Sequence, residues 1–252
     1  MVKTEILYGI HPVFEALRAR RRVVFEMYVA KGKIPNRFDK LVQLAESIDI
    51  PIKQVKPQEL KLITGTDQHQ GIGAKTGPYP FAKISDIKGI SGLDSKKYFL
   101  LLLDSIVDPH NLGALVRTAV CVGVDGVVIP KDRSASPTPA VSKASAGALE
   151  HVRLVRVTNM TNTIKNLKKQ DVWIVGLDKT SDETIFSKNL TGSIAIVIGG
   201  EEKGIRPLVK KHCDFLMSIP QAGLVNSLNA SVAGAVGMYE AFRQRRKKNG
   251  QE

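Results

Sequence analysis

Three short stretches of the sequence contain residue types that could support polar chemistry. In the first, an apolar run ends, Asn111 is positioned to cap a helix, and Arg117 follows within that helix. The neighbours of Arg117 in the sequence are apolar: Leu115, Val116 and Ala119. They predict that Arg117 is partly buried, and a partly buried arginine requires an anionic partner such as a phosphate group.

The second stretch is rich in glycine. Gly199, Gly200 and Glu201 follow an apolar run, and Gly204 comes shortly afterwards. Glycine lets the backbone approach a ligand closely, and Glu201 could hydrogen-bond a ligand or a neighbouring loop. The stretch has neither the spacing of a Walker loop nor that of the dinucleotide-binding fingerprint. Taken by itself, it is more typical of an ordinary tight turn than of a ligand site.

The third stretch runs from Ile219 to Ser231 and contains more polar side chains than one helix start needs. Ser227 or Asn229 would suffice as a cap, yet Asn226 and Ser231 are present as well. This surplus indicates a polar site. Two strand ends and one helix start therefore converge here, and ligands of open α/β sheets collect at the carboxyl ends of strands. Backbone amides at such turns favour a polar, partly anionic ligand.

The composition favours a soluble protein with a polyanionic partner. The chain has 252 residues, 43% of them hydrophobic, and a formal net charge of +13. Nucleic acid is the first candidate for that partner, and a merely solubilising charge is the alternative. Cys121 and Cys213 match no metal-ligand spacing. We expect reduced cysteines, no bound metal, no signal peptide or membrane span, and a cytoplasmic location.

Alternating strand and helix patterns predict the elements that position these stretches. From residue 97 onward, continuous apolar runs alternate with helical segments, which predicts an α/β fold with a mostly parallel sheet and helices on both faces. The expected strands begin at Tyr98, Gly126, Val152, Val172, Ile194 and Phe215. The expected helices are Asn111–Val122, Thr138–Leu149, Met160–Lys169, Pro207–His212 and Ser227 to about Lys247. Apolar residues share one face of the last helix, and its small residues permit close approach by another helix or a second subunit.

The N-terminal part reads as a separate small α/β unit. We assign residues 1–75 to it, 76–92 to a linker rich in glycine and proline, and 93–252 to the main domain. An arginine cluster follows the first helix: Arg18, Arg20, Arg21 and Arg22. This cluster, like the basic tail from Arg243 to Lys248, is either a solvated surface or an RNA contact.

In this order, the three stretches resemble the three motifs of the SpoU family of RNA ribose 2′-O-methyltransferases, within the SPOUT superfamily. The resemblance covers about residues 97–247. Asp108-Pro109 through Arg117 resembles the first motif, Ile198 to Gly204 the second, and Ile219 to Ser231 the third. The segment from Tyr8 to Leu17 is similar to the start of members that act on guanosine of 23S ribosomal RNA. Those members carry a small ribosomal-protein-like RNA-binding domain.

The resemblance implies a fold and a set of roles. It implies a deep C-terminal trefoil knot, a homodimer, and S-adenosylmethionine as methyl donor, bound near Gly199, Gly200, Ile219 and Leu228. Arg117 would activate the ribose hydroxyl, although an arginine is normally too basic to be neutral. The groups that position Arg117, the ribose and the cofactor loops would be Asn111, Glu201, Ser227 and Asn229.

The expected function is 2′-O-methylation of a ribose in RNA, most simply a guanosine of 23S ribosomal RNA. Within the same class, transfer RNA is the alternative substrate. A rival from another class is an RNA-binding protein without enzymatic activity, which would explain the charge but not the clustered glycine, asparagine and serine loops.

Overall fold

The computed structural model describes residues 3–32, 38–87, 97–224 and 227–248. The chain folds into two compact units. The first unit contains Met1–Pro80 and Ser136–His151, and the second contains Phe81–Ala135 and Val152–Glu252. Residues 136–151 therefore pack with the N-terminal segment, whereas the sequence pattern had placed them in the main domain. Asn226 and residues 88–92 of the expected linker lie outside the described residues.

The first unit is built on a four-stranded mixed sheet. Its strands, in sheet order, are β1 (Glu5–Tyr8), β4 (Ile72–Thr76), β2 (Val24–Ala30) and β3 (Ile52–Val55). Strand β4 is antiparallel to both β1 and β2, whereas β3 is parallel to β2. One core cluster joins the sheet to helices α1 (Ile10–Ala19) and α2 (Asp39–Glu46). A smaller cluster joins it to α3 (Pro57–Thr64).

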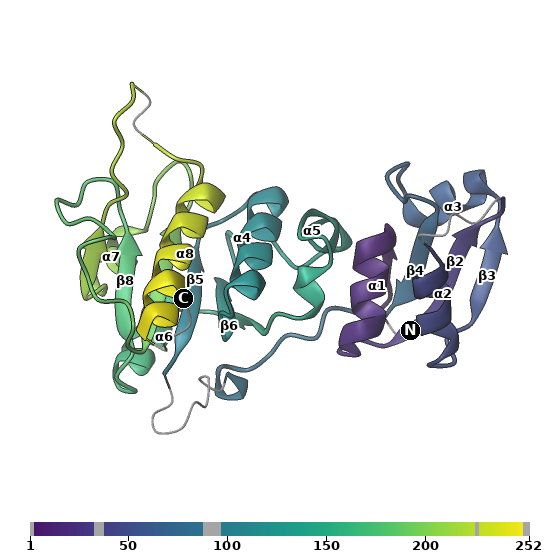
Figure 1. Ribbon diagram of the computed structural model, residues 1–252, viewed down its shortest axis with the longest axis horizontal. Helices are drawn as coiled ribbons and strands as arrows, with labels where there is room; N and C mark the ends of the chain where they lie inside the picture. Colours follow the sequence, from purple (N-terminus) through teal and green to yellow (C-terminus); the bar gives the residue numbers. More distant parts are fainter. Residues whose placement is uncertain (1–2, 33–37, 88–96, 225–226, 249–252) are drawn as a thin grey trace. The chain divides into compact units, whose positions relative to one another are not determined.

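The local sequence explains why α1 begins and ends where it does. Its buried residues Pro12, Val13, Ala16 and Leu17 recur at helical spacing and face the sheet. Arg20 then adopts the left-handed conformation with φ of 51°, and its backbone N–H donates to the carbonyl of Ala16. This closes the helix, so the arginine cluster lies at its end. Helix α5 (Pro139–Ala144) packs beside α1 within the same unit (Figure 1).

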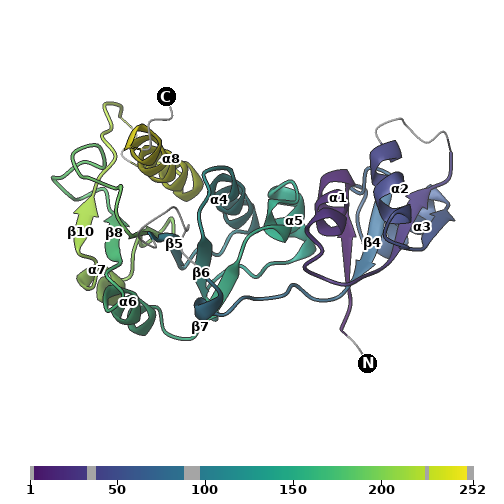
Figure 2. The ribbon, with the colours of Figure 1, turned by 60° about the horizontal axis from the view of Figure 1, so that its bottom comes forward.

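The second unit contains a six-stranded sheet in which all described pairs are parallel. In sheet order its strands are β10 (Phe215–Met217), β8 (Trp173–Leu177), β9 (Ile194–Gly199), β5 (Phe99–Asp104), β6 (Gly126–Pro130) and β7 (Leu154–Val157). Helices α4 (Pro109–Cys121) and α8 (Ala230–Lys248) cover one face, and α6 (Met160–Lys168) and α7 (Pro207–Lys211) cover the other (Figure 2). The expected α/β fold with a mostly parallel sheet is confirmed. Among the described residues, none of the helices combines the length and hydropathy required to span a bilayer.

Glycines allow α8 to pack closely against its neighbours. A Cβ added at Gly234 would lie 2.3 Å from Cδ2 of Leu115 on α4, and one at Gly237 would lie 2.9 Å from Cδ1 of Leu177. The small residues therefore face inward. The apolar residues expected to share one face of this helix form a stripe that faces outward, with Val232 47% and Tyr239 51% exposed. The stripe consists of Leu228, Val232, Ala235, Tyr239 and Phe242. An exposed apolar stripe on a helix is typical of a surface that another chain covers.

Several elements differ from the sequence prediction. Strands β1 and β4 were not predicted. The single helix expected over Thr138–Leu149 is interrupted, because Ala146 and Gly147 have φ of 51° and 84°; α5 is followed by a short 3₁₀ helix, η3 (Ala148–Glu150). Helix α8 begins at Ala230 rather than Ser227.

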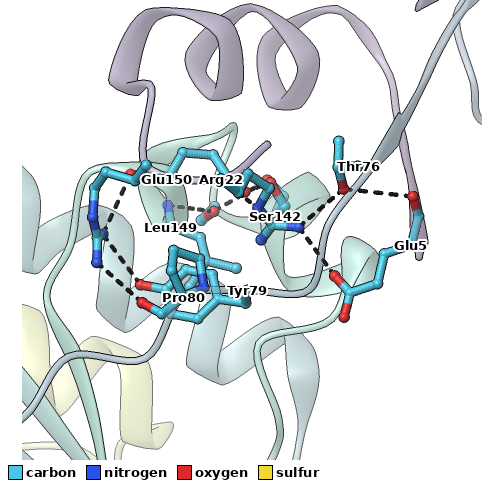
Figure 3. Close-up of polar contacts among 10 residues, drawn as sticks. Glu5, Arg22, Thr76, Tyr79, Pro80, Ser142, Leu149 and Glu150 are labelled. Carbon is cyan, nitrogen blue, oxygen red and sulfur yellow. Dashed lines mark hydrogen bonds and ion pairs between the residues drawn. The ribbon is translucent and has the colours of Figure 1, made fainter. Parts of the chain in front are cut away.

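A buried ionic network fastens residues 136–151 to the N-terminal segment (Figure 3). The Arg22 side chain is 1% exposed and forms ion pairs with Glu150 at 2.9 Å and with Glu5 at 3.0 Å. Ser142 donates to Glu150 at 2.9 Å, and Arg21 donates to the carbonyls of Glu150 and Pro80. Removing one partner of a buried ion pair leaves the other charge buried and uncompensated. The folded first unit therefore depends on all members of this network being present.

We expect Glu150→Ala to reduce the free energy of unfolding of the first unit by about 3–5 kcal/mol, because it leaves Arg22 buried without its closest partner. Urea unfolding followed by circular dichroism measures the change. The matched control is Glu46→Ala, at an exposed glutamate on α2, which should change stability by less than about 0.5 kcal/mol. Equal effects of the two substitutions would contradict the role of the network.

Candidate active site

The three stretches singled out in the sequence meet at Glu201. Its Oε1 accepts a hydrogen bond from Nδ2 of Asn111 at 2.6 Å and another from Nδ2 of Asn229 at 2.7 Å. Asn111 lies in the first turns of α4, Glu201 follows β9, and Asn229 immediately precedes α8. A carboxylate accepts several donors at once, so one side chain ties together a helix, a loop and a helix start.

The helix starts on either side of Glu201 are capped locally. Asp108, not Asn111, is the N-cap of α4: its side chain accepts from the backbone N–H of His110 at 3.0 Å, and Pro109 follows at the first helical position. The expectation that Asn111 caps this helix is therefore wrong, and its amide is available to Glu201. Asn229 has two tasks, because its Oδ1 accepts from the backbone N–H of Ser231 at 2.8 Å while its Nδ2 donates to Glu201.

Two glycines bring the loop after β9 against the backbone of its neighbours. A Cβ at Gly199 would lie 2.0 Å from the carbonyl carbon of Gly204, and one at Gly200 would lie 2.5 Å from the carbonyl oxygen of Ser105. The turn is closed by a hydrogen bond from Gly204 N–H to the carbonyl of Gly200 at 2.8 Å. Only glycine fits at these positions, so the loop is a tightly packed element that fixes the position of Glu201.

An ion pair that was not predicted holds the other end of this loop. Asp104 ends β5 with 0% exposure and accepts from Nε of Arg206 at 2.7 Å and from the Arg206 backbone N–H at 2.8 Å. Nη2 of Arg206 lies 2.6 Å from the same carboxylate. The signal in the sequence was a carboxylate that ends a continuous apolar run. Because Gly200 N–H also donates to the carbonyl of Asp104, the end of β5 anchors both ends of the loop.

Beside these loops lies a cavity of about 610 Å³, within the size range of small-molecule sites. It is lined by the predicted residues Gly199, Gly200, Glu201, Ile219, Ser227 and Leu228. Apolar side chains that were not predicted complete the walls: Leu177, Ile198 and Met217. A cavity whose lining combines apolar side chains with glycine backbone and polar residues such as Glu201 and Ser227 can hold a ligand that has a flat heterocycle and a polar end.

Asp178 and Lys210 form a charged corner of the cavity. Asp178 Oδ2 lies 2.7 Å from Nζ of Lys210, and Thr180 donates to its other oxygen. Burial alone would raise the pKa of Asp178, but the hydrogen bonds from Lys210 and Thr180 outweigh it and hold that pKa below its ordinary value. The carboxylate is therefore ionised near neutral pH and can accept hydrogen bonds from a ligand.

Comparison with known proteins identifies the family. Residues 98–239, more than half of the chain, match the SpoU rRNA Methylase family. The chain belongs to the SpoU family. Residues 6–82 match a second domain, described as RNA 2'-O ribose methyltransferase substrate binding. The family predicted from the three motifs is thus confirmed, and the N-terminal segment has a family match of its own.

Relatives match the SpoU chain over nearly its whole length. A 23S rRNA (guanosine-2'-O-)-methyltransferase RlmB from Photorhabdus laumondii is 42% identical over 96% of this chain and 99% of its own. A protein from Bacillus subtilis named putative TrmH family tRNA/rRNA methyltransferase YacO is 39% identical over 96% of both chains. A solved structure, the SpoU methyltransferase AviRb from Streptomyces viridochromogenes in complex with AdoMet, has the same fold. It is 22% identical, with a TM-score of 0.81 over 97% of this chain and 91% of its own.

Arg117 is not part of the Glu201 cluster. It lies six positions after Asn111, so the two side chains are about 120° apart around α4. Arg117 is exposed, which corrects the expectation of partial burial, and it does not line the cavity. Within the described parts of the chain no residue pairs with its guanidinium, which is therefore available to a group from outside this chain.

The arginines expected to contact RNA divide into two groups. Arg18 and Arg20 are exposed, and Arg18 makes only a loose ion pair with Glu15 at 3.8 Å. Arg21 and Arg22 instead belong to the ionic network of Figure 3. The expectation for Arg22 is corrected, because a side chain with 1% exposure cannot reach an RNA phosphate.

The basic tail shows the same division. Arg245 donates to the carbonyl of Tyr98 at 3.1 Å and lies over the Phe99 ring at 4.6 Å, and Arg243 donates to the Glu240 carboxylate. Arg246 and Lys247 are exposed. A charge run read from sequence alone thus overstates the number of cations available to RNA.

Proposed function

We propose that this SpoU protein transfers a methyl group from S-adenosylmethionine to the 2′-hydroxyl of a ribose in RNA, and that the ribose belongs to a guanosine of 23S ribosomal RNA. The relative named RlmB, 42% identical over almost the whole of both chains, supports this substrate. The formal net charge of +13 is complementary to RNA. An enzyme with this substrate would work in the cytoplasm.

One observation carries the proposal. Glu201 accepts hydrogen bonds from Asn111 and Asn229, so the three family motifs converge at the edge of one cavity. The cavity fits the cofactor in chemical character: Ile219 and Leu228 offer apolar contact to a heterocycle, and Gly199 and Gly200 line the cavity without side chains, so that backbone can approach the ligand closely. When bound there, S-adenosylmethionine supplies an electrophilic methyl group.

The chain's own residues would prepare the nucleophile and hold it in place. A ribose hydroxyl is a poor nucleophile until it loses its proton, and we assign the stabilisation of the deprotonated oxygen to the exposed Arg117. Asn111, Glu201 and Asn229 would keep the cofactor loops in one geometry, with Ser227 as a further polar contact. Correct alignment of the reacting atoms supplies a large share of the rate in such transfers.

The finer features of the fold belong to the same proposal. We infer the trefoil knot of the family in the C-terminal part of the second unit. The strand order supports it, because β9 lies between β8 and β5 while β10 returns to the outer side of β8. We also retain an RNA-binding domain over residues 1–75, followed by a linker over 76–92. The substrate-binding match over residues 6–82 supports an RNA-binding role for the N-terminal part, but β4 extends to Thr76 and the first unit to Pro80, so this domain continues past residue 75. Arg18 and Arg20 are its candidate phosphate contacts.

We further propose that the protein works as a homodimer that buries the outward stripe of α8. Val232 and Tyr239 lie on this stripe, both about half exposed, and Phe242 makes an edge-to-face contact with Tyr239. An aromatic side chain at the centre of an apolar patch is typical of residues that dominate binding at an interface.

Tyr239→Asp is expected to convert the dimer to a monomer, because it buries an unpaired carboxylate in the interface. Sedimentation equilibrium measures the mass. The control is Lys247→Asp near the end of the same helix, where the side chain is exposed outside the stripe; it should leave the mass unchanged. A dimer that persists in Tyr239→Asp would mean that another surface joins the subunits.

Methylation of defined RNAs tests the function. Purified protein is incubated with S-adenosylmethionine and either unmodified 23S ribosomal RNA or unmodified transfer RNA, and ribose methylation is mapped by mass spectrometry. We expect one methylated guanosine in the ribosomal RNA. Methylation of transfer RNA alone would support the alternative substrate. RNA binding with no methylation of either RNA, by a protein that also fails to bind S-adenosylmethionine, would favour a non-enzymatic RNA-binding protein.

A further inference from the structure

A second cavity lies in the second unit, beside the candidate active site. Its volume is about 410 Å³, within the range of small-molecule sites. Its walls come from strands β8, β9 and β10 and from residues 188–192, which we call the rim loop. Met217 lines both cavities, so the second cavity adjoins the first along β10. None of the residues that line the second cavity belongs to the three family motifs.

An aromatic pair forms one wall of this cavity. Trp173, the single tryptophan of the chain, stacks on Phe215 with ring centroids 5.4 Å apart and an interplanar angle of 30°. Trp173 is nevertheless 54% exposed. A tryptophan is usually largely buried, so a stacked and half-exposed indole provides a rigid aromatic surface for a further ring.

A cation and an amide, both able to contact a nucleotide, lie beside the aromatic pair. Nζ of Lys188 lies 5.1 Å from the centroid of the Phe215 ring, and its ion pair with Glu183 joins two partly exposed side chains and is therefore weak. Asn189 is exposed, and its Oδ1 accepts from Thr191, while its Nδ2 donates to none of the described residues. The cavity thus offers a ring surface, a cation and an amide donor.

The last helix holds the rim loop in place. Gln244 on α8 accepts from the backbone N–H of Leu190 at 2.7 Å and donates to the carbonyl of Lys188 at 3.0 Å. Arg245 donates to the carbonyl of Gly192. A loop fixed at three backbone positions loses little freedom when a ligand binds, which favours binding.

We propose that this cavity binds one unpaired nucleobase of the RNA substrate, stacked on Trp173, with Lys188 beside the adjoining phosphate. This inference rests on the proposed function, which supplies RNA as the partner. Unpaired bases are recognised by stacking on aromatic side chains together with hydrogen bonds to their edges, and a nearby cation follows the backbone. The strongly positive net charge of the chain matches this partner.

The single tryptophan makes the site directly observable. A short single-stranded oligoadenylate should quench the fluorescence of the full-length protein to saturation, and a blunt RNA duplex should quench it far less because its bases are already stacked. Trp173→Ala should weaken oligoadenylate binding by about five- to 150-fold, and Trp173→Phe should restore most of it. Phe186→Ala is the matched control: Phe186 is also 54% exposed but does not line the cavity, so affinity should not change.

Two results would overturn the inference. One is a Trp173→Ala variant that binds oligoadenylate as tightly as the wild type while S-adenosylmethionine binding, measured by calorimetry, shows it to be folded. The other is a change of molecular mass in that variant, which would make the cavity an interface between copies. Methyl transfer is assayed separately. An active wild type without quenching refutes only this site, whereas quenching without methyl transfer refutes only the proposed function.

Discussion

Arg117→Ala is expected to lower kcat for methyl transfer by about a hundredfold to ten-thousandfold, the usual contribution of a group that assists proton removal, while affinity for S-adenosylmethionine stays unchanged. The structure explains why kcat should fall while cofactor affinity stays the same. Arg117 is exposed on α4 and pairs with no described residue, so its removal breaks no contact that supports the fold or the cavity. Steady-state methylation at saturating RNA and cofactor measures kcat, a single-turnover reaction measures the chemical step alone, and calorimetry measures cofactor binding.

Two further variants define what Arg117 contributes. Arg117→Lys keeps the positive charge but loses the planar guanidinium, so a large loss there would show that geometry matters beyond charge. Arg153→Ala removes another exposed arginine of the second unit and should retain wild-type turnover. Full activity of Arg117→Ala under saturating conditions would refute the assignment and move the search for the activating group to Asn111, Glu201 and Asn229.

The fold of the second unit was largely predictable because its strands are continuous apolar runs covered on both faces. Strand β4 of the first unit was not, because it contains Gly73 and Ala74, which are poor strand formers. It forms because it lies between β1 and β2 and pairs with both. Gly73 also has a packing reason, since a Cβ there would lie 3.1 Å from Cγ2 of Thr64 on α3. Such a reason is visible only in three dimensions.

The residues that line the cavity could be predicted from the sequence, but the burial of side chains and their long-range partners could not. The cavity residues were found because glycine and polar residues cluster at strand ends. The burial of Arg117 was misjudged because Val116 and Leu115 are its neighbours in sequence, and residues one or two apart on a helix do not share a face. The ion pair between Arg22 and Glu150 joins residues far apart in the chain. No local sequence pattern predicts a partner at that distance.

Gly199→Ala is expected to weaken S-adenosylmethionine binding by about five- to 150-fold, which corresponds to the 1–3 kcal/mol that overpacking typically costs. The added Cβ would lie 2.0 Å from the carbonyl carbon of Gly204 and 2.1 Å from the backbone nitrogen of Ile205. These are backbone atoms and cannot rotate away as a flexible side chain would. The turn must therefore move, and Glu201, which lies within the turn, moves with it and disturbs its hydrogen bonds to Asn111 and Asn229.

Gly192→Ala is the matched control, since a Cβ at Gly192 would meet nothing within 4 Å. Calorimetric titration with S-adenosylmethionine gives Kd for both variants, and thermal unfolding shows whether each remains folded. The expected pattern is a folded Gly199→Ala protein with weakened cofactor binding beside a Gly192→Ala protein that matches the wild type. If Gly199→Ala binds the cofactor normally, the turn can shift without moving the cavity wall, and the cofactor must be held mainly by the stretch from Ile219 to Leu228.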